Sequence, residues 1–312
     1  MAMHQTQKES KICNTLSQLG SLKSYARNGN LDIREYLKIY LGADKKAALK
    51  DAAPKYIEEH YPKAYKQAYS LPEGYILNNR EFNTQKKSSD IHLPQESVSM
   101  VFNALKDAFR HVPSLTIFEY AFTDTLLKGI DKKKRKEFID NLKVPVEALE
   151  SGDHDVFGIG IFGKDIVGIF FQIKATTSKS NQKTFLKRLE EATKQIKKDL
   201  TVFCTMCGEF LNGNVKLAGF AAFPMLSKSD LKKLMKSKDC TERILTSDDL
   251  RNEKSFQSFF NENKIELKEF DNPEPLVMQS FKDIFDLYIC AASAVNIPRN
   301  PTDSPRRGEL NA

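Results

Sequence analysis

Two apolar runs joined by a tight turn dominate the middle of the chain. Between Val156 and Phe171 the charged residues are Lys164 and Asp165, which lie in the turn that follows Phe162 and Gly163. Short apolar runs bounded by turn residues are typical of strands buried on both faces, and a short Gly-containing connection between them indicates a β-hairpin. The sequence therefore predicts two apolar strands joined by a tight turn in this region.

The segments around the hairpin extend this pattern. Apolar residues at helical spacing predict an amphipathic helix from Gln95 to about His111, with Glu96 in its first turn. The other expected elements are strands at 115–122, 201–205 and 215–225 and helices at 182–200, 230–236 and 248–261, the last two capped by Ser227 and Ser247. This order predicts an α/β fold with a mixed β-sheet flanked by helices, rather than a regular doubly wound fold.

The chain divides into three regions by composition. Residues 1–90 are polar, Lys-rich and helical in pattern, residues 95–296 carry the α/β pattern, and residues 297–312 are rich in Pro and Arg. We therefore expect a helical N-terminal region, one α/β domain and a disordered tail.

Net charge and cysteine content indicate what kind of partner and which cellular compartment to expect. The 312 residues carry a formal net charge of +7, which favours an acidic partner, nucleic acid being the commonest. Five scattered cysteines do not form a disulfide framework, and no signal peptide is evident, so we expect an intracellular protein of the nucleus or cytoplasm. No apolar run approaches the roughly 20 residues that a membrane span needs. The pattern does not indicate an oligomeric state.

Polar residues mark the end of the hairpin that lies away from its turn. Asp153 and Asp155 open the first strand, and Gln172 and Lys174 close the second. Residues two apart in a strand face the same way, so Gln172 and Lys174 should share one face. If the hairpin folds in register, Asp155 lies across from this pair, and the three side-chain heads come within reach of one cation.

Such a group of side chains suits a hard divalent cation. Mg²⁺ or Mn²⁺ prefers oxygen ligands and usually takes only one or two carboxylates from a protein. Asp155 would give a carboxylate oxygen, Gln172 its side-chain carbonyl and Ile173 its backbone carbonyl. Lys174 would lie beside the metal-bound water, where it could activate the nucleophile or stabilise charge on a phosphate. A phosphodiester is the natural substrate for this combination.

The arrangement resembles the PD-(D/E)XK nuclease superfamily, which has a restriction-endonuclease-like core. The likeness is to its NERD-like and RecB-like branches, where an acid on one strand precedes E/Q-x-K on the next, and it covers about residues 95–226. The resemblance implies that Asp155 is the metal-binding acid, Gln172 the second motif position and Lys174 the catalytic lysine. It further implies that Glu96 helps to bind metal or orient the lysine. Gln195 is similar to a helix glutamine found in some RecB-like members.

The resemblance implies a metal-dependent nuclease acting on DNA or, second, on RNA. The sequence departs from the family pattern in three ways. No Pro precedes the acid, Asp153 competes with Asp155 for the metal-binding role, and Gln172 replaces a second carboxylate, which should weaken metal binding. Asp155 is preferred because it directly opens the apolar strand. The alternative is a catalytically inactive module of the same fold that binds nucleic acid or protein.

Basic residues near the hairpin are candidates for phosphate contacts. Lys187, Lys194 and Lys198 lie outside the apolar stripe of the 182–200 helix, where they could bind the nucleic-acid backbone or form a solvated face. The run from Lys132 to Lys136 could be a nuclear-localisation signal, a nucleic-acid contact or a solvated connector.

Overall fold

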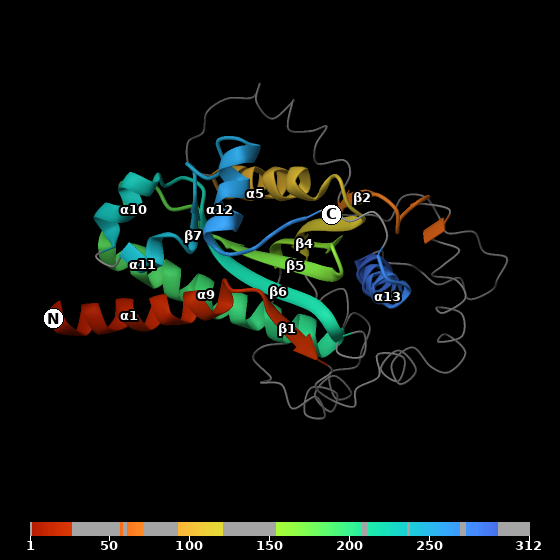
Figure 1. Cartoon of the computed structure of the whole chain (residues 1–312). Coiled ribbons are helices and arrows are strands. Elements are labelled where there is room, and N and C mark those ends of the chain that lie inside the picture. The colour runs from red at the N-terminus through yellow and green to blue at the C-terminus, as the bar shows by residue number, and fades with distance from the viewer. Residues whose placement is uncertain are drawn as a thin grey trace, which may run out of the picture.

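The computed structural model describes residues 2–26, 57–58, 61–71, 93–120, 154–207, 211–235, 238–268 and 273–292. Within them a seven-stranded mixed sheet lies between helices on both faces (Figure 1). The predicted fold class, a mixed β-sheet flanked by helices with a helix at the N-terminus, is confirmed. The basic run at 132–136, Asp153 and the expected tail lie outside the described residues.

The described elements follow one another along the chain. The strands are β1 (Lys23–Ala26), β2 (Ala68–Leu71), β3 (Ser114–Tyr120), β4 (His154–Phe162), β5 (Asp165–Ile173), β6 (Asn212–Phe223) and β7 (Ile244–Thr246). The helices are α1 (Ala2–Leu19), α5 (Leu93–Phe109), α9 (Gln182–Met206), α10 (Lys228–Leu234), α11 (Lys238–Thr241), α12 (Glu253–Glu262) and α13 (Pro275–Ala292). No helix in these ranges is long and apolar enough to cross a membrane.

The sheet has the strand order β1-β6-β5-β4-β3-β2, with β7 also paired to β6. Strands β3, β4 and β5 form an antiparallel meander, and α9 then carries the chain to β6, which is parallel to β5. β6 has two partners on its other edge: β1 pairs antiparallel with its first half and β7 parallel with its end. β1 and β2 belong to the first 90 residues, and both pair with strands of this sheet.

The β4–β5 hairpin forms at the predicted turn. Its register runs from Val156 opposite Phe171 to Phe162 opposite Asp165. Gly163 in the turn has a φ of 61°, a left-handed conformation that glycine adopts without steric cost. The hairpin is therefore placed by local sequence, as its turn residues and apolar runs predict.

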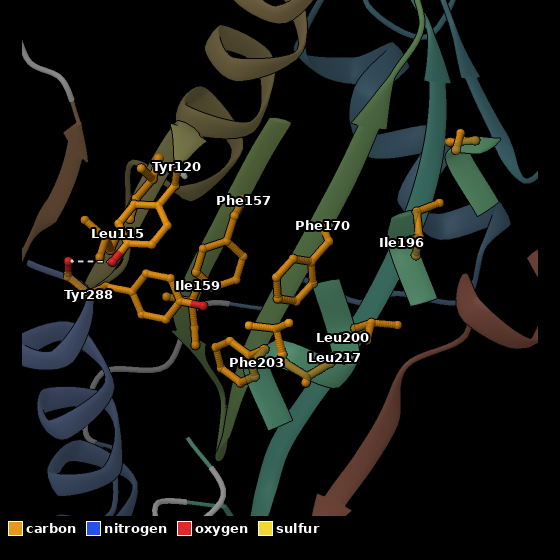
Figure 2. Close-up of a cluster of buried hydrophobic side chains, with 14 of the residues drawn as sticks. Leu115, Tyr120, Phe157, Ile159, Phe170, Ile196, Leu200, Phe203, Leu217 and Tyr288 are labelled. Carbon is orange, nitrogen blue, oxygen red and sulfur yellow. Dashed lines mark hydrogen bonds between the residues drawn. The ribbon is translucent and has the colours of Figure 1, made fainter. Parts of the chain in front are cut away.

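Each face of the sheet buries its own apolar cluster. On one face, here the α5 side, residues of α5 and α12 such as Phe102 and Phe256 cover β4, β5 and β6. On the other, the α9 side, residues of α1, α9 and α13 form the second cluster. Figure 2 shows part of the α9 side, where Phe157 and Phe170 of the hairpin stack at 4.4 Å between ring centroids and Tyr288 of α13 lies beside them.

Two local predictions are wrong. Residues 201–205, expected as a strand, are the last part of α9, because Phe203 continues the apolar stripe of the helix and packs on Phe170 with ring centroids 5.6 Å apart. Burial against the hairpin outweighs the β propensity of this segment. Ser227 caps α10 as expected, but Ser247 caps no helix, since α12 begins at Glu253 after the N-cap Asn252.

Candidate active site at the open end of the hairpin

The open end of the hairpin is the end away from its turn, where β4 begins and β5 ends. There the alternation of side chains between the two faces breaks. Phe118 of β3 and Val156 of β4 are cross-strand partners whose side chains lie on the α5 side. The next paired residues toward the open end, Tyr120 and His154, have their side chains on the α9 side instead. Glu119 lies at the break with a φ of 48°, a left-handed conformation that is uncommon for a residue with a side chain.

At this break the side chain of Asp155, rather than a backbone carbonyl, accepts a hydrogen bond from the neighbouring strand. Its carboxylate Oδ2 accepts the backbone N–H of Ile173 at 2.6 Å, just beyond the last paired residues of the β4–β5 ladder. A hydrogen bond to a charged group contributes about 1.5–3 kcal/mol. The half-buried carboxylate is thus held at the edge between the two strands, next to the residue that precedes Lys174.

Gln172 and Lys174 reach the same helix on the α9 side. The Nε2 of Gln172 donates to Oδ2 of Asp199 at 2.9 Å, and the Nζ of Lys174 donates to Oε1 of Gln195 at 2.5 Å. The two side chains share one face of the sheet, as the period of two predicts. Gln195, which the family resemblance singles out, is in direct contact with the lysine.

The spacing of the two pairs explains their fit. Two residues along a strand span about 6.6 Å, and four residues along a helix span about 6 Å. Gln172 and Lys174 are two apart on β5, while Gln195 and Asp199 are four apart on α9. Gln172 contacts the later helix residue, Asp199, and Lys174 contacts the earlier one, Gln195. The helix α9 therefore runs antiparallel to β5 here. The i, i+4 spacing of two polar residues on a helix that covers the hairpin was the available signal for Asp199, which sequence reasoning missed.

Asp199 also joins a buried polar network. Its Oδ1 lies 3.2 Å from Nδ1 of His154, and Nε2 of His154 lies 3.3 Å from the hydroxyl of Tyr288 on α13. His154 and Asp199 are 1% and 2% exposed, so these groups are taken out of water and depend on one another. Burial raises the pKa of Tyr288 well above its ordinary value, which keeps the phenol protonated. The network ties β4, β5, α9 and α13 together behind the open end.

A cavity of about 360 Å³ opens on the α5 side of the same strand ends. Two carboxylates, those of Asp155 and Glu119, line it, together with Pro94, Val98, Ile173 and Ala175. The chain leaving β5 forms one wall, and Arg188 of α9 fixes it by donating to the carbonyl of Ala175 at 3.2 Å.

Glu96 is in the first turn of α5, as predicted, and its side chain is exposed. The residues of α5 that line the cavity are Pro94 and Val98, one turn apart. Glu96 lies midway between them in sequence, about 200° around the helix from each. The structure therefore does not bring Glu96 to the cavity, and its assignment rests on the family resemblance alone.

The three lysines proposed for phosphate contacts all belong to α9. Lys187 lies 3.9 Å from Glu191, and Lys194 lies 3.0 Å from Glu190, so each has an acid one turn away. Hydrogen bonds from Lys8 of α1 and from Lys194 lower the pKa of Glu190. Lys198 is partly exposed. Two of the three proposed contact lysines are therefore already paired with acids of the same helix, although the helix as a whole carries more basic than acidic side chains.

The residues around the cavity fit a hydrated divalent cation. Within the described ranges no three His, Cys, Asp or Glu side chains gather in a way that could hold a metal ion. Mg²⁺, however, keeps several waters and usually takes only one or two carboxylates. Asp155 and Glu119 supply two, and a cavity of about 360 Å³ leaves room for several waters of about 30 Å³ each.

Comparison of the chain with models of known families, with curated proteins and with solved structures finds no match.

Proposed function

We propose that this protein is a metal-dependent nuclease that hydrolyses phosphodiester bonds in nucleic acid, DNA rather than RNA, at the open end of the hairpin. The observation that carries the proposal is the pairing of Asp155 with the amide of Ile173 and of the next residue, Lys174, with Gln195. The acid lines the cavity on the α5 side, while the ammonium group is held at the same strand end but on the α9 side, against Gln195.

Each of these groups has a role in the proposed reaction. Asp155 and the backbone carbonyl of Ile173 would hold the cation, Mg²⁺ or Mn²⁺, which when bound supplies Lewis-acid stabilisation of the phosphate and a more acidic water. Lys174, restrained by Gln195, would orient the attacking water or stabilise charge on the phosphate. The net charge of +7 supports an anionic substrate.

Gln172 takes a different part from the one expected of it. Its amide donates to Asp199 in the core, where Gln172 is 0% exposed. We assign it to holding β5 against α9, so that Lys174 and Gln195 stay in contact, rather than to binding the cation.

The second candidate is a catalytically inactive module of the same fold that binds nucleic acid or protein. Two observations favour it: Gln172 occupies a position where a second carboxylate is expected, and Glu96 does not reach the cavity. Such a module would need the exposed lysines of α9 for binding, but it would not need the contact between Lys174 and Gln195.

Cleavage of mixed DNA and RNA substrates in Mg²⁺ or Mn²⁺ tests the proposal. Lys174→Ala should lower the rate about 10²–10³-fold, on the scale of a lost oxyanion donor. Lys164→Ala is a matched control, because Lys164 is exposed in the turn at the opposite end of the same hairpin.

Two results would contradict this function. Binding of nucleic acid by the wild type without metal-dependent cleavage would favour the inactive module. Equal rates for the two lysine variants, with unchanged melting temperatures, would remove Lys174 from the chemistry.

A further inference from the structure

The connection that leads from β5 into α9 carries positive charge without any acid. It begins at the candidate active site, and all of its charged side chains between residues 174 and 188 are basic: Lys174, Lys179, Lys183, Lys187 and Arg188. The first acid that follows is Glu190. A surface segment with charges of one sign attracts partners of the opposite sign.

Two lysines of this connection face the solvent and have no acid to balance them. Lys179 and Lys183 are exposed, and no acid of the described ranges lies within 4.0 Å of either ammonium group. Lys183 is held outward, because Phe185, about 200° away around the helix, is fully buried. Lys194, further along α9, is by contrast paired with Glu190 at 3.0 Å.

The connection is folded by hydrogen bonds that leave these lysines unused. Arg188 donates from Nη1 to the carbonyl of Ala175 at 3.2 Å and to Oγ1 of Thr176 at 2.9 Å. Asn181 caps α9 by accepting the N–H of Thr184 at 2.9 Å. The ammonium groups are therefore carried on a segment whose backbone is already ordered, which lowers the entropy cost of binding a partner.

The segment lies where open α/β sheets bind their ligands, outside the carboxyl ends of parallel strands. Phe185 packs on Phe223, the last residue of β6, with 4.9 Å between ring centroids. The connections that follow β6 and β7 pair their charges with one another, as Lys228 lies 2.7 Å from Asp249. The connection after β5 has no such partner for Lys179 within the described ranges.

We propose that Lys179 and Lys183 bind the sugar-phosphate backbone of a DNA strand whose scissile phosphate lies at Lys174. This inference rests on the proposed function, because it names the surface that holds the substrate of that site. It moves the phosphate contacts from Lys194, which Glu190 holds, to the connection beside the strand end. Contacts of this kind position the nucleic acid without reading its sequence, so binding should depend on salt and not on sequence.

Fluorescence anisotropy of a labelled DNA duplex with the full chain, in EDTA and at several salt concentrations, tests the proposal without cleavage. The double variant Lys179→Ala/Lys183→Ala should weaken binding about tenfold at low salt and reduce the log–log salt slope by about 0.9 for each lost contact. Lys179→Arg/Lys183→Arg keeps both charges and should bind as the wild type does.

A matched control removes the same charge from the other end of the hairpin. Lys164 and Lys66 are both exposed there, since Lys66 precedes Gln67, whose carbonyl accepts the N–H of Ser114 opposite Gly160. Lys164→Ala/Lys66→Ala should change the affinity less than twofold. Equal losses in the two alanine variants would show an effect of net charge alone and overturn the inference.

The remaining outcomes separate this inference from the proposed function. Wild-type affinity and slope in Lys179→Ala/Lys183→Ala, with metal-dependent cleavage at an unchanged KM, would overturn the inference and leave the nuclease proposal standing. Lost binding in that variant, with no cleavage by the wild type, would support the inference and overturn the nuclease proposal. Binding to phosphatidylserine vesicles through these two lysines, without binding to DNA, would make an anionic membrane the partner and overturn the inference.

Discussion

The two ends of the β4–β5 hairpin follow different rules. At the turn, Phe162 pairs with Asp165 in regular register, and the left-handed position is filled by Gly163, around which a Cβ would find open space. At the open end, the left-handed position is filled by Glu119 on the neighbouring strand β3, and the side chain of Asp155 takes the place of a ladder partner.

The polar contacts of the two ends differ in the same way. Asp165 at the turn pairs with Lys216 of β6 at 2.5 Å, and both side chains keep some contact with water. At the open end Gln172, Asp199 and His154 are buried together. At the turn end each residue has a conformation that its own side chain favours. The polar contacts of the open end instead require β4, β5, α9 and α13 to pack together. The turn end therefore follows from local sequence, whereas the open end follows from tertiary contacts.

The largest effect is expected when a charge is added to the buried network. Gln172→Glu would place a second carboxylate against Asp199, and we expect a loss of about 3 kcal/mol or more in the free energy of unfolding at pH 7. One of the two acids would take up a proton in the folded state, so its pKa would be raised and the loss should shrink as the pH falls towards 5. Urea unfolding at several pH values measures this.

Asp165→Asn is the matched change at the turn end. It removes a partly exposed ion pair and should cost less than about 1 kcal/mol. An unchanged stability of Gln172→Glu, or a gain in Mn²⁺ affinity, would place Gln172 at the metal rather than in the core.

The pH dependence of stability should come from α13, which closes the α9 side of the open end. Burial raises the pKa of Asp286 to about 6 from 3.8, against the lowering effect of its 2.5 Å hydrogen bond from Tyr65. Between about pH 4 and pH 6 the folded state therefore binds more protons than the unfolded state. The free energy of unfolding should fall as the pH rises through this interval, by at most about 3 kcal/mol.

Asp286→Asn should abolish that step, and Tyr65→Phe should extend it to higher pH, because the hydrogen bond that favours the carboxylate is lost. Urea unfolding of the three proteins from pH 4 to pH 8 makes the comparison. A stability that rises through this interval in the wild type but not in Asp286→Asn would contradict the assignment.

The smallest effect is expected at the turn. Gly163→Ala should lower the free energy of unfolding by about 1 kcal/mol, because the left-handed backbone disfavours a Cβ and no neighbouring atom lies within 4 Å of it. Glu119→Gly should instead gain stability, because glycine adopts the left-handed backbone of Glu119 without steric cost, so the two variants should have effects of opposite sign. Chemical unfolding of both variants sharpens the comparison, and two losses of similar size would remove it.

Local sequence predicts the turn end well and the open end in part. The apolar runs, the turn residues and the shared face of Gln172 and Lys174 follow from strand period and turn chemistry alone. The family resemblance singled out Gln195 but did not predict its contact with Lys174, since nothing in the strand indicates which helix residue the lysine meets. Glu119 could not be found in this way, because a left-handed backbone inside a strand leaves no mark on a sequence that carries glutamate there.

Asp199 shows a different limit of the sequence. An acid in a helix is usually solvated, and its burial follows only once α9 is known to lie antiparallel to β5 and α13 to close the same side. The error at residues 201–205 has the same origin. Phe203 is helical because it packs on Phe170 of the hairpin, which is distant from it in sequence.

The edge of β6 bears on how the chain assembles. β1 and β7, which cover this edge, come from residues 23–26 and 244–246, so two stretches more than two hundred residues apart must both arrive before the strand is shielded. Contacts between such distant segments form slowly, and an uncovered strand edge can pair with another chain. Loss of the first 26 residues should therefore lead to aggregation during refolding even where the hairpin and its helices are intact.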